Sequence, residues 1–163
     1  MQTFFGKKEL FFSIKFFIIF LVLQFFILSA PLAQLENFIA SAEAGALGLQ
    51  SSGNIVFFED QSFQVGANCT GLLSGAILFA VVFAMKKPDF RKKLLIAAAG
   101  ALVLFLLNFP RVFFVLWAAK NFGAGLAETL HEITWMTTAV LVLIVWFFAI
   151  RKIAKTKNFA ELI

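Results

Sequence analysis

The chain has 163 residues, of which 61% are hydrophobic and only 14% are charged, and its mean hydropathy is +0.93. Soluble domains carry about 45–50% apolar and about 25% charged residues, so this composition excludes a soluble domain and predicts a membrane protein. The length suits one small bundle, and we expect residues 1–163 to form a single integral membrane domain. A single Cys excludes an intramolecular disulfide, and a single Cys with a single His argues against a metal centre or another cofactor.

Four apolar segments have lengths near that of a transmembrane helix. A bilayer core of about 30 Å requires about 20 helical residues. The segments are residues 10–30, 70–85, 94–119 and 130–150. The second is short, so we expect it either to include Asn68 and Cys69 in its first turn or to cross a locally thinned bilayer. The pattern predicts an all-α membrane protein built as a bundle of four transmembrane helices.

Most of the 14 Lys and Arg residues lie in three regions: near the N-terminus, between the second and third segments, and after the fourth. Four spans would place these regions on one side of the membrane, and positively charged flanks face the cytoplasm. We therefore expect a multi-pass protein of the cytoplasmic membrane with both termini in the cytoplasm. Most acidic residues fall on the outer side, so the net charge of +5 reflects topology and does not indicate binding to nucleic acid.

The first segment has two interpretations. It resembles a cleaved signal peptide in that basic residues precede it and small residues follow it at Ala30 and Ala33. Its apolar part is longer than the usual length of about 7–15 residues, and Leu28 and Pro31 interrupt the small-residue cleavage triplets. A retained membrane anchor is the interpretation we favour.

Residues 31–69 form the predicted outer loop, and two elements are expected in it. A short amphipathic helix resting on the outer surface is indicated by apolar residues at helical spacing: Leu32, Leu35, Phe38, Ile39 and Ala42. A small β-hairpin is indicated by two short strand patterns, residues 55–58 and 62–65, separated by Glu59-Asp60-Gln61. We expect the hairpin to pack across the outer end of the bundle, because an isolated hairpin is only marginally stable.

Cys69 opens the second segment from its outer side. A helix N-terminus carries about half a positive charge, which lowers the pKa of a thiol and raises its thiolate fraction. Gly71 and Gly75 form a small-x-x-x-small pair that allows another helix to approach closely. The alternative is that Cys69 is an inert small residue.

Arg111 lies inside the third apolar segment. A guanidinium costs about 2.5–3.5 kcal/mol at the centre of a bilayer on insertion scales, so such a residue usually serves a function. A rise of about 1.5 Å per residue from Leu94 places it about 25 Å across, in the outer part of the membrane. Pro110 and Phe109 predict a kink that aims Arg111 inward, with Asn108 satisfying the freed backbone groups. The alternative is an Arg that extends to the outer headgroups.

His131 lies at the outer start of the fourth segment. Thr129 and Glu132 have the spacing of a capping box, so Glu132 is expected to cap the helix and His131 to occupy its first turn. Taken alone, His131 is better explained as an interfacial residue that bonds headgroups.

The predicted topology brings these three residues to one membrane face from three helices. A thiol nucleophile requires a base or a nearby cation at neutral pH; His131 can be the base and Arg111 the cation. Arg111 can also stabilise the oxyanion of a tetrahedral intermediate. The combination of Cys69, Arg111 and His131 indicates acyl transfer.

At these residues the sequence resembles the exosortase and archaeosortase family. The resemblance covers about residues 55–150 and depends on the order and spacing of three short blocks: Asn68-Cys69-Thr70-Gly71, Asn108-Phe109-Pro110-Arg111-Val112 and His131. It implies a multi-pass cysteine transpeptidase with Cys69, Arg111 and His131 as catalytic residues. Supporting roles are implied for Asn68, Thr70, Gly71, Asn108 and Glu128, although whether Glu128 orients His131 stays open.

The resemblance also implies partners. The substrate would be a surface protein whose C-terminal sorting signal contains a short motif, a transmembrane helix and basic residues. The enzyme would cleave this signal outside the membrane and pass the new C-terminus to an acceptor, a membrane lipid in archaeal members. Many relatives are longer and have more spans, so this chain resembles a reduced core, which leaves substrate recognition and the acceptor open.

Two alternatives belong to other classes. One is a small four-helix transporter or channel that binds an anion at Arg111, although such proteins usually place ionisable groups near the midplane. The other is a non-catalytic scaffold for a second membrane protein.

Overall fold

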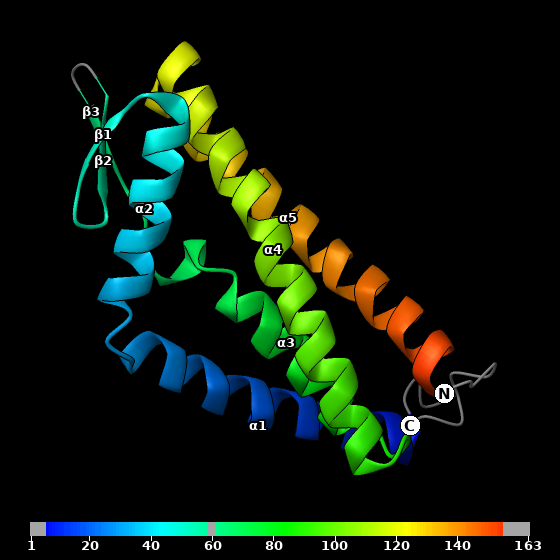
Figure 1. Ribbon diagram of the computed structural model, residues 1–163. Coiled ribbons are helices and arrows are strands. Elements are labelled where there is room, and N and C mark those ends of the chain that lie inside the picture. The colour runs from blue at the N-terminus through cyan, green and yellow to red at the C-terminus, as the bar shows by residue number, and fades with distance from the viewer. Residues whose placement is uncertain (1–5, 59–60, 155–163) are drawn as a thin grey trace.

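The computed structural model describes residues 6–58 and 61–154 and is predominantly helical (Figure 1). Its helices are α1 (Lys7–Ser29), α2 (Ala33–Leu47), α3 (Leu72–Ala84), α4 (Phe90–Phe122) and α5 (Ala124–Ala149). Three strands, β1 (Gln50–Ser52), β2 (Ile55–Phe58) and β3 (Gln61–Gln64), a 3-10 turn η1 (Ala67–Cys69) and a π-helical turn η2 (Ile150–Ala154) complete the described elements.

Three helices among the described residues are long and apolar enough to cross a membrane: α1, α4 and α5. They correspond to the first, third and fourth predicted segments. The second predicted segment is shorter than expected, because α3 has only 13 residues and extends about 20 Å at 1.5 Å per residue. The prediction that Asn68 and Cys69 join its first turn is wrong, since α3 begins at Leu72.

Helices α4 and α5 form a long antiparallel pair, and they lie side by side in Figure 1. Gly123 alone joins them, and its φ of 87° lies in a region that side chains disfavour. Helix α4 has 33 residues and continues through Pro110. Its length of about 50 Å exceeds the thickness of a bilayer core.

Helix α3 packs between α1, α4 and α5. Its contact with α4 is close at Gly100, where a Cβ atom would collide with the side chain of Leu78. Helix α1 has no buried residue, and many of its large apolar side chains are exposed, as expected for a helix with one side facing lipid. A buried apolar cluster joins α3 to α4 and to the C-terminal part of α5. It consists of Leu78, Val82, Met85, Ile96, Leu104, Val142 and Ile150.

Helix α2 and the sheet pack beside the C-terminal half of α4 (Figure 1). The predicted hairpin is confirmed and has an additional strand, which gives an antiparallel sheet in the order β1-β2-β3. The predicted helix is also present, but its buried face differs: Ile39, Ala40 and Ala44 are buried, whereas Phe38 is exposed. The packing against α4 and the sheet therefore selects a different face from the one that apolar spacing suggests.

The start of α1, the turn between α3 and α4, and the end of α5 lie at the same end of the molecule (Figure 1). The sheet and the Gly123 turn lie at the opposite end. The fold thus brings the basic residues on either side of the α3–α4 turn to the same end as Arg151 and Lys152 of η2.

Candidate active site

Cys69 ends the η1 turn, three residues before α3 begins. The loop between them is shaped by its neighbours. The hydroxyl of Thr70 donates to the Ala67 carbonyl at 2.7 Å and accepts from the Leu72 backbone N–H at 3.3 Å. Gly71 has a φ of 78°, and a Cβ atom there would lie 3.0 Å from the Asn108 Cβ. Gly71 is therefore required both by the turn and by the close approach of α4.

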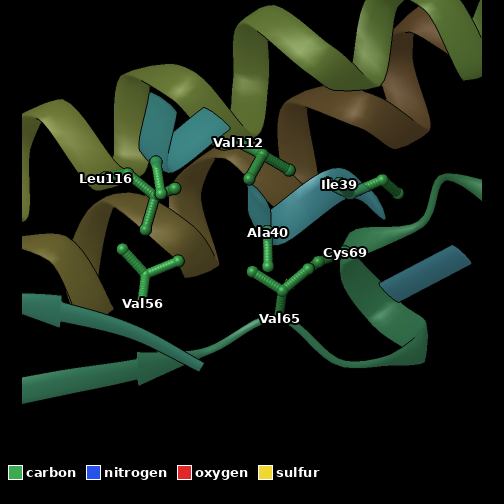
Figure 2. Close-up of a cluster of buried hydrophobic side chains, with 8 residues drawn as sticks. Ile39, Ala40, Val56, Val65, Cys69, Val112 and Leu116 are labelled. Atoms are coloured by element: carbon green, nitrogen blue, oxygen red, sulfur yellow. The ribbon is translucent and has the colours of Figure 1, made fainter. Parts of the chain in front are cut away.

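The Cys69 side chain is a free thiol and is 5% exposed. It packs in an apolar cluster, where Figure 2 shows it next to Val65 and Ala40, with Val112 of α4 in the same cluster. Three elements, the η1 loop, α2 and α4, thus enclose the sulfur.

Burial raises the pKa of the Cys69 thiol. A hydrogen bond from the Gly66 backbone and the charge of Arg111 act in the opposite direction, and Glu36 adds to the increase. The expected lowering by a helix N-terminus is wrong in its net direction, because the thiol lies before α3 in an apolar cluster. Arg111 is the cation whose field favours the thiolate.

Asn108 connects Cys69 to Arg111. Its side chain is buried, and its amide donates to the backbone carbonyl of Cys69. Its side-chain oxygen accepts a hydrogen bond of 3.1 Å from Nη1 of Arg111. The amide therefore joins α4 to the η1 turn, whereas the sequence had suggested that it would satisfy backbone groups near Pro110.

Arg111 is connected in turn to α5. Its Nε donates to the hydroxyl of Thr134 at 3.3 Å, and that hydroxyl donates to the backbone carbonyl of His131 at 3.1 Å. A continuous chain of hydrogen bonds thus runs from the carbonyl of Cys69 through Asn108, Arg111 and Thr134 to the carbonyl of His131. The remaining nitrogen of the guanidinium, Nη2, is buried and has no hydrogen-bond partner in the described part of the chain.

His131 is half-buried on α5, and its ring meets that of Phe63 edge-to-face with centroids 6.0 Å apart. Arg111 and Glu132 are the charged groups that interact with its imidazole. The predicted capping box is wrong, because α5 begins at Ala124 and the Thr129 hydroxyl bonds the Gly125 carbonyl within the helix. His131 therefore lies in the second turn of α5.

Among the three predicted catalytic residues, Arg111 is the one that connects the other two. Among the described residues, no hydrogen bond joins the Cys69 thiol to the His131 imidazole, and Arg111 interacts electrostatically with both. Of the supporting residues, Thr70 is buried next to Cys69 and Gly71 contacts Asn108 of α4, whereas Asn68 is exposed. The side chain of Glu128 lies outside what the structure describes.

The sequence did not indicate Thr134, which lies in a run of ordinary helical residues. Thr134 lines a cavity of about 80 Å³ between α4 and α5, together with Asn108, Arg111, Thr137 and Thr138. Its three-residue spacing from His131 would place both on one side of α5, which is the only signal that the sequence contains.

No group of three or more metal-ligating side chains gathers within residues 6–58 and 61–154.

Comparison with known proteins identifies the family. The sequence profile of the transmembrane exosortases matches residues 3–154, which is nearly the whole chain. No curated protein and no solved structure matches the chain. The match includes all four apolar segments and the complete hydrogen-bond chain from Cys69 to His131. The chain is a membrane protein and belongs to the transmembrane exosortase family.

Proposed function

We propose that the protein is a membrane-embedded cysteine transpeptidase that removes a C-terminal sorting signal from surface proteins and transfers the new C-terminus to a membrane lipid. Cys69 is the nucleophile, His131 the general acid and base, and Arg111 the group that stabilises negative charge. The observation that carries this proposal is that Nη2 of Arg111 is buried and has no hydrogen-bond partner among the described residues. A buried donor without a partner is costly, and catalytic sites keep such donors for charge that develops in the transition state.

In the first half of the reaction, the thiol proton of Cys69 moves to His131 and the sulfur attacks the substrate carbonyl. Arg111 stabilises first the thiolate and then the oxyanion of the tetrahedral intermediate. The intermediate collapses when the peptide C–N bond breaks, and His131 returns its proton to the leaving amine. The products are a thioester on Cys69 and the released signal helix with a free amine.

In the second half, a nucleophilic group of the acceptor attacks the thioester carbonyl. His131 takes the proton of this group, the C–S bond breaks, and the sulfur leaves as a thiolate that is protonated again. A lipid headgroup with an amine or hydroxyl would supply the nucleophile. Water would give simple hydrolysis.

The proposed topology has four spans, both termini in the cytoplasm, and the site at the outer face of the cytoplasmic membrane. The gathering of basic residues at one end of the fold supports it, since positive flanks stay in the cytoplasm. Helix α2 and the sheet would then lie on the outer side, above the short helix α3. An apolar groove of about 240 Å³ between α1, α3 and α4 is lined by Gly71 and Gly75, and the hydrophobic helix of the substrate would lie against it.

The test is a processing assay with a tagged surface protein that ends in a hydrophobic helix and a basic tail. We expect the wild type to release the helix and both Cys69→Ala and Arg111→Ala to lose release by at least about a hundredfold. Arg91→Ala changes an exposed Arg on the same helix, α4, and serves as the control. Undiminished processing by Cys69→Ala or Arg111→Ala would falsify the mechanism. A thioester that hydroxylamine cleaves should be found on Cys69, which is the only Cys of the chain.

A further inference from the structure

Thr134 occupies the point where Arg111 meets the helix that carries His131. It lies about one turn after His131 on α5, and its side chain is partly buried against α4. Its hydroxyl has two partners: Nε of Arg111 at 3.3 Å and the backbone carbonyl of His131 at 3.1 Å. One small side chain therefore connects two of the three proposed catalytic residues.

The direction of these hydrogen bonds follows from the chemistry of the groups. A guanidinium has only donors, so the hydroxyl of Thr134 must accept from Nε. A carbonyl has only acceptors, so the single hydroxyl hydrogen must go to His131. Both requirements are met at once, and the hydroxyl cannot rotate away without losing one of them. The neighbouring Thr137 differs in this respect, because within the described part of the chain its hydroxyl bonds only the Ile133 carbonyl of its own helix.

A guanidinium is planar, so two fixed nitrogens determine the direction of the third. Asn108 holds Nη1 and Thr134 holds Nε, which leaves the buried and unpaired Nη2 with a fixed direction. Without the Thr134 bond, the group would be held at one nitrogen and could turn about it. We propose that Thr134 is a positioning residue. It orients Arg111 toward the charge that develops at Cys69 and fixes the position of the guanidinium relative to the turn of α5 that carries His131. This proposal rests on the proposed function.

Three variants test it in the processing assay. Thr134→Val keeps the shape but removes the hydroxyl, Thr134→Ser keeps the hydroxyl, and Thr137→Val removes one of the two other threonine hydroxyls that line the same cavity. Hydrogen bonds to charged groups are worth enough for about a tenfold effect, so we expect Thr134→Val to be about tenfold slower in kcat. Thr134→Ser and Thr137→Val should stay close to wild type. Wild-type turnover by Thr134→Val would overturn the proposal.

A double-mutant cycle separates positioning from a general structural role. Lys has no nitrogen at the position of Arg Nε, so Arg111→Lys removes the planar group that the Thr134 bond orients. We expect Thr134→Val to slow the wild type about tenfold but to change Arg111→Lys by less than about twofold. An equal loss in both backgrounds would show that Thr134 acts through packing, and it would overturn the proposal. Thr134→Ala repeats the cycle if Thr134→Val fails to fold.

A second readout does not depend on processing and distinguishes failure of this proposal from failure of the proposed function. The pH dependence of Cys69 alkylation by iodoacetamide reports the charges around the thiol, which are Arg111 on α4 and Glu36 on α2. We expect the alkylation midpoint to rise in Arg111→Ala, and to rise by about half as much in Thr134→Val, because the cation is less well placed. A midpoint raised by Arg111→Ala but unchanged by Thr134→Val contradicts the positioning role, whether or not the substrate is processed.

Discussion

The side-chain amide of Asn108 on α4 donates to the backbone carbonyl of Cys69, 39 residues earlier in the chain. The same side chain accepts from Arg111 at 3.1 Å. Asn108 thus joins the Cys69 loop to the guanidinium, and a substitution should disturb both. We expect Asn108→Ala to lower the stability in detergent by about 1–3 kcal/mol, because a buried carbonyl and a guanidinium nitrogen each lose their partner.

The measurement for Asn108 is thermal unfolding of the purified protein, followed by intrinsic Trp fluorescence. Asn121→Ala is the matched control, since Asn121 is exposed on the same helix and its amide bonds only the Trp117 carbonyl. A control loss as large as that of Asn108→Ala would contradict the interpretation. Asn108→Asp should retain the contact with Arg111 but lose the bond to Cys69, because a carboxylate has no donor.

Gly71→Ala should distort the loop that carries Cys69. The new Cβ would lie 3.0 Å from the Asn108 Cβ, at a backbone φ of 78°. A left-handed backbone costs a residue with a side chain about 1–2 kcal/mol, and the contact with α4 adds to this cost. We expect a stability loss of about 2 kcal/mol in thermal unfolding and a lower rate of Cys69 alkylation or substrate processing.

The control for Gly71 is Gly45→Ala on α2, where a Cβ atom meets nothing within 4 Å. Because Ala favours a helix over Gly by about 1 kcal/mol, this variant should be neutral or slightly more stable. Equal stability of Gly71→Ala and the wild type would show that the loop is not constrained by Asn108.

Glu43 on α2 is expected to make stability depend on pH. Burial raises the pKa of Glu43 from 4.5 to about 6, and its side chain is only 5% exposed. The unfolded chain loses this proton at a lower pH than the folded chain, so stability falls as the pH rises from about 4.5 to about 6 and stays lower above that. Glu43→Gln removes the ionisation, and we expect it to raise the stability at pH 7 by about 1–2 kcal/mol.

This is measured as the unfolding temperature between pH 4.5 and pH 7 in one detergent. The gain from Glu43→Gln should be largest at pH 7 and small near pH 4.5, where the wild-type carboxyl is protonated. Glu9→Gln removes an exposed carboxylate and controls for the change in net charge. A gain that is independent of pH would contradict a role for Glu43 ionisation.

The proposed topology predicts opposite accessibility at the two ends of the bundle. In a Cys69→Ala background, a single Cys is introduced either at Asn121, beside the Gly123 turn, or at Lys87, in the turn between α3 and α4; both positions are exposed. Positive flanks stay in the cytoplasm. We therefore expect a membrane-impermeant maleimide to label Asn121→Cys in intact cells and Lys87→Cys only after permeabilisation. The reverse pattern would place the site on the cytoplasmic side.

Much of the fold could be predicted because its signals are local. The three long apolar helices follow from hydropathy and length, and the β2–β3 hairpin follows from two short strand patterns. The errors occurred where a neighbouring element decides the outcome. The buried face of α2 depends on α4 and the sheet, and the start of α5 depends on the Gly123 turn, which made the Thr129 and Glu132 spacing misleading.

The same difference between local signals and tertiary packing applies to the candidate site. Cys69, Arg111 and His131 could be singled out because each is chemically unusual in its own apolar segment. Their linkage through Asn108 and Thr134 could not be predicted. A polar residue on a helix has many possible partners until the rotation of that helix and its crossing with its neighbours are known.

The amino-acid sequence by itself determined that the chain lies in a membrane and where its long apolar helices are, and it singled out Cys69, Arg111 and His131 as candidate site residues. Only the tertiary structure decided that the Cys69 thiol is buried in an apolar cluster, that its loop is bonded to α4, and that Nη2 of Arg111 has no hydrogen-bond partner within residues 6–58 and 61–154. The physical reason is that hydropathy is a property of consecutive residues. Hydrogen bonds between helices are set by packing at positions far apart in the chain, which no local pattern records.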